Sequence, residues 1–271
     1  MIKWRIHNPG RSKTLVYLPG LHGDWTLLGR FRLALAGRAT LVELAYPRDV
    51  FWSLEEHAAG VVDALREAGV GKGWLLAESF GSQVAWALLR LLEQGLGKGF
   101  EGEGLILAGG FVRHPWPWSL QPSRRLLGSR SSRLIGKGVR FWARHVWFRN
   151  CDDPEMLADA RAFLSRQGGT GRGMGRHRLQ LIAQADWRAE ASKARLPVYY
   201  LTGLFDPIVP WPWVVWWLKR SCPSLRGTRI VFFCDHHVLG TAAGKAADQI
   251  MRWVEGGEAP PALQKSRVPL E

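Results

Sequence analysis

The feature that most constrains the fold is an alternation of short β-rich runs with longer helix-like runs. The β-rich runs of the first third lie at residues 14–18, 40–44, 73–78 and 104–110, and helix-like runs fill residues 24–37, 53–69 and 81–95. Strands joined by helical crossovers lie parallel, with helices packed on the sheet. The sequence therefore predicts an α/β fold: a mostly parallel central sheet flanked by helices.

One of these helices carries a clear start signal. Ser53 precedes an amphipathic run and Glu56 follows three residues later, the spacing of a capping box. Gly69 stands where the helix is expected to end, because glycine readily adopts the left-handed conformation found there.

The alternation is interrupted once, between residues 111 and 185. This segment is rich in tryptophan and arginine, and residues 151–167 have its clearest helical pattern. The stretch GGTGRGMG, residues 168–175, follows no strand and lacks the GxGxxG spacing of a dinucleotide site, so we expect a loop that acts as a hinge. We predict that residues 111–185 form a helical lid inserted into the core.

Beyond the lid the alternation resumes. The sequence predicts strands at residues 196–203 and 228–234 and helices at residues 212–221 and 241–255. The expected organisation is a core of residues 1–110 and 186–255, the lid at 111–185, and a loosely docked tail at 256–271.

The turn AESFGS, residues 77–82, joins a strand directly to a helix. Ala77 and Gly81 are small, as a sharp turn requires where strand and helix nearly touch, and such a turn lifts the Ser79 hydroxyl clear of the sheet. The following helix N-terminus supplies positive potential for a developing oxyanion. Ser79 is therefore a candidate nucleophile, although a serine in an ordinary turn or helix cap would have a similar sequence.

An early loop offers the complementary electrostatic element. The strand at 14–18 runs into Pro19, Gly20 and Leu21, and the glycine lets the backbone approach a substrate closely. The backbone N–H groups of Leu21 and Phe80 are candidate donors to an oxyanion. His22 is expected in a surface turn, without a catalytic role.

Two further polar residues follow predicted strands. Asp206 comes after the strand at 196–203, at the edge where open α/β sheets bind ligands, although it could also cap a turn. His236 and His237 follow the strand at 228–234 and would point in opposite directions, so only one could meet Ser79. A histidine there could act as general base, with Asp206 fixing its tautomer. Asp235 and Asp186 are less suitable acids, because the first is adjacent to the histidine and the second precedes the strand that carries Asp206.

Taken together, these residues occur in the chain order Ser, Asp, His, which is that of α/β-hydrolases. The sequence resembles that superfamily over roughly residues 14–255, with a similarity of LPGLHGDW to the LPGLDGTG signature of one branch of esterases and acyltransferases. AESFGS resembles the ESFSG elbow of that branch, and DHHVLG resembles its PHLLLQ region, which favours His236 over His237. His22 stands where that branch usually has aspartate.

The resemblance implies a serine hydrolase that cleaves a carboxylic ester or thioester of a small molecule, with Ser79, His236 and Asp206 as its triad and without a metal or organic cofactor. Two alternatives stay open: an acyltransferase with the same triad, and a catalytically silent fold used for binding.

Charge distribution points to anionic partners. The chain has a net charge of +14, and residues 111–150 contain nine Lys or Arg and no Asp or Glu. Such a field attracts an acidic carrier or an anionic lipid surface, or it is a solvated basic surface without a specific partner. Nucleic acid is a less favoured partner, since no reading motif accompanies the charge.

The cellular compartment is inferred from the cysteines and from the apolar segments of the sequence. Three widely spaced cysteines fit neither a disulfide framework nor a CxxC metal site, and the first ten residues lack an apolar signal region. The longest apolar window, near residues 209–218, is too short for a transmembrane helix. We therefore expect a cytoplasmic protein.

The lid charges lead to a first testable prediction. Neutralising Arg124, Arg125, Arg130 and Arg133 together should raise KM for an anionic acyl substrate and leave KM for a neutral short ester almost unchanged. The effect should shrink in high salt, because exposed charges are screened beyond ~10 Å at 0.1 M ionic strength. An equal response of both substrates, or no response to salt, would contradict an electrostatic role for the lid.

Overall fold

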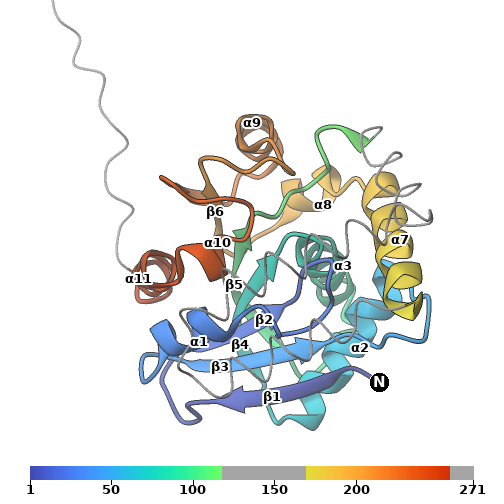
Figure 1. The fold of residues 1–271 in the computed structure, drawn as a ribbon. Helices are drawn as coiled ribbons and strands as arrows, with labels where there is room; N and C mark the ends of the chain where they lie inside the picture. Colours follow the sequence, from blue (N-terminus) through green and yellow to red (C-terminus); the bar gives the residue numbers. More distant parts are fainter. Residues whose placement is uncertain (118–168, 257–271) are drawn as a thin grey trace, which may run out of the picture.

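The computed structural model describes residues 1–117 and 169–256. Its centre is a seven-stranded sheet in the order β1-β3-β2-β4-β5-β6-β7 (Figure 1). Every neighbouring pair is parallel except β1 and β3, which run antiparallel at one edge. The mostly parallel sheet predicted from the sequence is thus confirmed. The strands are β1 (Lys3–His7), β2 (Thr14–Leu18), β3 (Thr40–Ala45), β4 (Lys72–Glu78), β5 (Glu101–Ala108), β6 (Val198–Gly203) and β7 (Leu225–Val231).

Helices cover both faces of the sheet (Figure 1). Side chains alternate along each strand, so Val16 and Leu75 pack on one face while Leu15 and Leu76 pack on the other. The first face packs against α2 (Leu54–Glu67), α3 (Gly81–Glu93), α7 (Gly169–Gln184), α8 (Arg188–Lys193) and α9 (Trp211–Ser221). The second packs against α1 (Gly29–Leu35), α10 (Val238–Thr241) and α11 (Ala243–Val254).

The parallel strands decide where the loops of the candidate site residues begin. Strands β2, β4, β5, β6 and β7 run in the same direction, so the segments that follow them start at one edge of the sheet. Residues 19–23, the turn at Ser79, and the loops of Asp206 and His236 all lie at this carboxyl edge.

The glycine-rich stretch 168–175 differs from the prediction of a loop, because helix α7 begins at Gly169. Each glycine weakens a helix by about 1 kcal/mol relative to alanine, so local propensity argues against this helix. Its buried face supplies the compensation: Met174, Leu179 and Ile182 pack against the core. Tertiary burial therefore overrides a glycine-rich sequence.

The strand predicted at 228–234 is shifted, since β7 ends at Val231. Phe232 and Phe233 are strongly exposed, and Phe233 has a left-handed φ of 56°. Aromatic residues favour strands, which is why the sequence predicts one here, but these two residues form the turn that leads to His236. Strand β1 and helix α8 were not predicted at all.

Several predictions concern residues outside the described ranges. The helix at 151–167, the four lid arginines, and the tail beyond Gly256 lie there, so the division into core, lid and tail stays a prediction. In the described residues, each helix is too short or too polar to cross a bilayer. Cys222 and Cys234 are buried free thiols.

Helix α2 begins with the predicted capping box. The Ser53 hydroxyl accepts a hydrogen bond from the Glu56 N–H (3.1 Å), and the Glu56 carboxylate accepts one from the Ser53 N–H (2.7 Å). The prediction is confirmed in both halves.

We expect Ser53→Ala to lower the free energy of unfolding by about 1 kcal/mol, because the Glu56 N–H loses the hydroxyl that accepts its hydrogen bond. Urea denaturation followed by circular dichroism would measure the loss. Ser192→Ala is the matched control, since the exposed Ser192 hydroxyl donates to the Ala189 carbonyl within α8 (2.7 Å) and caps no helix start in the described residues. Equal destabilisation by the two variants would show that the capping box contributes nothing.

Candidate active site

Ser79 occupies a strained turn between β4 and α3. Its φ of 48° is left-handed, which is unfavourable for a residue with a Cβ. The Ser79 N–H donates to the Ala108 carbonyl at the end of β5 (3.0 Å), which anchors the turn to the sheet. A Cβ on Gly81 would lie 2.2 Å from the Leu18 carbonyl oxygen, so only glycine allows α3 to begin this close to β2. The predicted need for a small residue at this position is confirmed.

Three side chains from separate loops form one hydrogen-bonded chain at this edge. His236 Nε2 lies 2.8 Å from the Ser79 hydroxyl, and His236 Nδ1 lies 2.6 Å from Asp206 Oδ2. The Asp206 side chain is fully buried, and its Oδ1 accepts hydrogen bonds from the N–H groups of Ile208 and Val209 at 2.9 and 2.8 Å. The structure therefore brings together the three residues singled out from the sequence, in the geometry of a nucleophile, a base and an orienting acid.

The loop that carries His236 is held against the end of β6. A Cβ on Gly203 would lie 2.2 Å from the Asp235 carbonyl oxygen, so a glycine is required for this approach. Leu204 and Phe205 then donate their N–H groups to the carbonyls of Val231 and Cys234, at 2.9 and 3.0 Å. These contacts set the separation between the acid loop and the histidine loop.

The neighbouring polar residues have other partners. Asp235 Oδ1 accepts hydrogen bonds from the His237 N–H (3.0 Å) and the Thr241 hydroxyl (2.9 Å), so it stabilises the start of α10. Asp186 pairs with Arg188 on the surface (2.7 Å). The Ser82 hydroxyl donates to the Ser79 carbonyl (2.6 Å), which braces the turn.

The loop after β2 packs against the Ser79 turn. The Gly23 N–H donates to the Gly20 carbonyl (2.9 Å), and a Cβ on Gly20 would lie 3.6 Å from the Glu78 carbonyl oxygen. Leu21 and Phe80 thus belong to two loops that meet beside the serine. Their role as oxyanion donors stays a prediction.

His22 was expected in a surface turn, but it is only partly exposed. Burial lowers its pKa to about 4, so the imidazole is neutral near pH 7. Its Nε2 lies 3.5 Å from the Tyr17 hydroxyl, and its ring lies over Gly20. Glu78 and His237 lie close enough to influence the charge of this imidazole.

Arg178 is a site residue that the sequence interpretation missed. This α7 side chain is buried, it donates from Nη1 to the Leu21 carbonyl (2.9 Å), and its guanidinium lies 5.7 Å from the centre of the Phe80 ring. Burial lowers its pKa to about 10, which leaves it cationic near pH 7. It connects α7 to the loop of Leu21. In the sequence it is one arginine among many in a basic segment, so no pattern distinguishes it.

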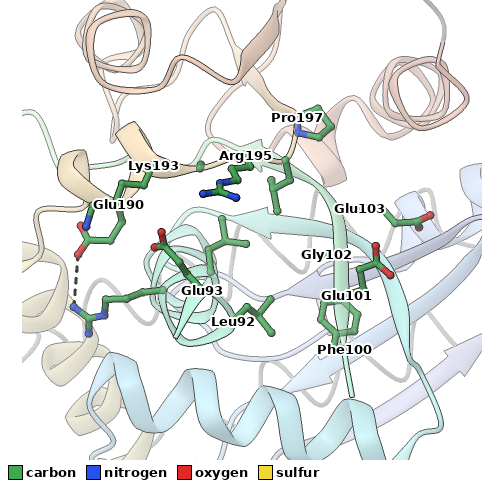
Figure 2. Close-up of a pocket in the computed structure, with 14 residues that line it drawn as sticks. Leu92, Glu93, Phe100, Glu101, Gly102, Glu103, Glu190, Lys193, Arg195 and Pro197 are labelled. Atoms are coloured by element: carbon green, nitrogen blue, oxygen red, sulfur yellow. Dashed lines mark ion pairs between the residues drawn. The ribbon is translucent and has the colours of Figure 1, made fainter. Parts of the chain in front are cut away.

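A hollow of about 840 Å³ lies elsewhere, at the beginning of β5 and β6, where Figure 2 shows Glu101, Glu103 and Arg195 around it. An ion pair between Glu190 and Arg90 (3.7 Å) spans one side. The part of its lining that the structure describes includes no serine, cysteine or histidine. It lies at the opposite end of these strands from Ser79, and its described lining includes neither Ser79, Asp206 nor His236.

The acid assignment can be tested by the reactivity of Ser79 toward a fluorophosphonate. Asp206→Asn should slow phosphonylation by about 10⁴-fold, the loss that this exchange causes when the histidine takes the wrong tautomer. Asp235→Asn is the control: its Oδ1 can still accept both hydrogen bonds, so we expect a rate close to wild type. A large loss in Asp235→Asn with Asp206→Asn unaffected would move the acid to position 235.

Several solved structures share the overall fold of this chain. The chain matches a thermophilic esterase from Thermogutta terrifontis with a TM-score of 0.70 and 18% identity, over 95% of this chain and 94% of that one. It matches an enol-lactonase from Burkholderia xenovorans LB400 (TM-score 0.70, 15% identity, 94% and 96% covered) and a bromoperoxidase from Bacillus anthracis (0.71, 12%, 94% and 95%). No family model and no curated protein matches the chain. The shared architecture is the α/β-hydrolase fold, which this chain has.

Proposed function

We propose that the protein is a serine hydrolase that cleaves a carboxylic ester or thioester through an acyl-enzyme. The observation that carries the proposal is the hydrogen-bonded chain Ser79–His236–Asp206, with donor–acceptor distances of 2.8 and 2.6 Å. The strained φ of Ser79 supports it, because strain in a buried, well-braced turn is typical of a functional position.

In this mechanism the Ser79 oxygen attacks the acyl carbonyl while His236 Nε2 takes its proton. Asp206 stabilises the resulting imidazolium and keeps Nδ1 protonated. The N–H groups of Leu21 and Phe80 hold the oxyanion, and losing one such donor typically lowers kcat by ~10²–10³-fold. His236 then protonates the leaving alcohol or thiol. Water, activated by the same imidazole, releases the acid and restores Ser79.

The matched structures include proteins named esterase and enol-lactonase, both of which are named for cleavage of an ester bond. Their identity to this chain is too low to transfer a substrate. They support ester hydrolysis as the reaction class, while the acyl-enzyme and the substrate rest on the site residues.

We further propose that residues 111–185 cover the site and contribute to the acyl pocket. Helix α7 supports this, because Arg178 contacts the Leu21 carbonyl from within that segment. The substrate would be a small acyl ester or thioester, and the basic charge of the segment would favour an acidic carrier or an anionic lipid surface.

The function is tested with p-nitrophenyl esters of increasing acyl length. Wild type should release p-nitrophenol with saturation kinetics, and Ser79→Ala should lose at least about 10³-fold in kcat. Mass spectrometry after fluorophosphonate treatment should place the adduct on Ser79. Ser192→Ala is the matched serine control and should react normally.

Three outcomes would contradict the proposal. An adduct on another serine with Ser79→Ala still active would overturn the nucleophile. Absence of both labelling and turnover in wild type would favour a silent binding fold. Ester formation with an added alcohol in preference to hydrolysis would identify an acyltransferase.

A further inference from the structure

Next to the triad lies a second pair, a buried glutamate and a partly buried histidine, that the mechanism does not use. Glu78 precedes Ser79, and His237 follows His236. His237 Nδ1 donates to Glu78 Oε1 (2.6 Å), and the Glu78 side chain is 5% exposed. His237 Nε2 lies 3.1 Å from the Leu27 carbonyl, so both ring nitrogens have an acceptor. The pair therefore joins the serine turn to the histidine loop.

Tyr17 extends this pair to the third loop of the site. It lies near the end of β2, just before Pro19–Leu21, and its hydroxyl donates to Glu78 Oε2. The tyrosine is fully buried. Both Glu78 carboxylate oxygens are consequently occupied, one by the histidine loop and one by the strand that leads into the Leu21 loop.

The residues around His237 leave room for its ring and hold it in place. A Cβ on Gly240 would lie 2.1 Å from His237 Nε2, so a larger residue at that position of α10 would displace the imidazole. The Asp235 carboxylate accepts from the His237 N–H (3.0 Å) and fixes its backbone. His237 is thus held from its backbone and from both ring nitrogens.

Glu78 and His237 each favour the charged form of the other. Burial alone would raise the pKa of Glu78, but the His237 charge and the hydrogen bonds from His237 and Tyr17 lower it to about 2. Burial would lower the pKa of His237, and the Glu78 charge outweighs this and raises it. Asp235 also raises the pKa of His237, while His22 is neutral.

A buried ion pair is weak evidence for stability, because desolvation can offset the attraction, yet it can specify one arrangement of the chain. Here each member is adjacent to, or one short loop from, a residue of the proposed mechanism: Ser79, His236 or Leu21. We propose that Glu78, His237 and Tyr17 form a positioning network that holds the three loops in register for acyl transfer, an inference that rests on the proposed function.

The network touches neither the acyl chain nor the leaving group in this mechanism, so its loss should act on kcat. Glu78→Gln keeps the shape of the side chain and removes its charge. A displacement of about 1 Å can lower the rate about 10²-fold, so we expect kcat to fall roughly tenfold or more. KM for p-nitrophenyl esters should stay within about twofold, and Tyr17→Phe should give a smaller loss of kcat.

A second buried glutamate, on the strand next to β2, provides a matched control for Glu78→Gln. Glu43 on β3 is fully buried and pairs with Arg32 (2.9 Å) and Arg5. It lies opposite Tyr17 in the β2–β3 register, but in the described residues the Tyr17 hydroxyl bonds to Glu78 and not to Glu43. Glu43→Gln should lower the thermal midpoint while leaving kcat near wild type. Circular dichroism would set an assay temperature at which every variant is folded.

A double-mutant comparison of kcat provides a second test of the network. If Glu78 and His237 act as one unit, the double variant Glu78→Gln/His237→Gln should have a kcat close to that of the worse single variant, because the second change finds the pair already broken. Multiplicative losses would show that the two residues act independently.

The outcomes separate this inference from the proposed function. An active wild type with unchanged kcat in folded Glu78→Gln, or an equal kcat loss in Glu43→Gln, would reject the network alone. A loss confined to KM would also reject it. An unreactive wild type would reject both. If Glu78→Gln does not fold, the kcat values of Tyr17→Phe and His237→Gln provide the test instead. A wild-type kcat in both variants would reject the proposed network.

Discussion

The parallel pairing of β2, β4, β5 and β6 is the constraint on which the rest of the structure depends. Since these strands share a direction, the loops that follow them begin at one edge, and no functional side chain has to cross the core. The remaining distances are decided by backbone contact. Gly81 allows α3 to start against the Leu18 carbonyl, and Gly203 allows the histidine loop to rest on β6. Both glycines are therefore determinants of site geometry.

Two layers of hydrogen bonds share this edge. Ser79 and Glu78 are consecutive, as are His236 and His237, and within each couple the two side chains bond to different partners. One residue of each couple consequently meets in the upper layer at 2.8 Å and the other in the lower layer at 2.6 Å. The lower layer is charged and closed to solvent on the Glu78 side, whereas the upper layer presents a hydroxyl at the turn.

Much of the fold followed from local signals. Ser53 and Glu56 predicted the start of α2, and the run at residues 14–18 predicted β2 with the bounds observed. Those signals succeeded because capping and β-propensity act over a few residues. The prediction of a loop at residues 168–175 was wrong, because the helix there depends on the burial of Met174 and Leu179. Local helix propensity carries no information about such burial. The prediction of a strand at Phe232 and Phe233 was wrong for the opposite reason. Aromatic residues are common in strands, but the chain turns at these two positions.

The sequence by itself determined the alternating architecture and the identity of Ser79, Asp206 and His236 as candidates, because strand ends and chain order can be located from local pattern. The tertiary structure was needed to show that His237 turns to Glu78, that His22 is largely withdrawn from solvent, and that Arg178 reaches the Leu21 carbonyl. Each of these depends on contacts between residues far apart in the chain. Their partners are chosen by the packing of loops at the sheet edge, and that packing leaves no pattern within a short window of sequence.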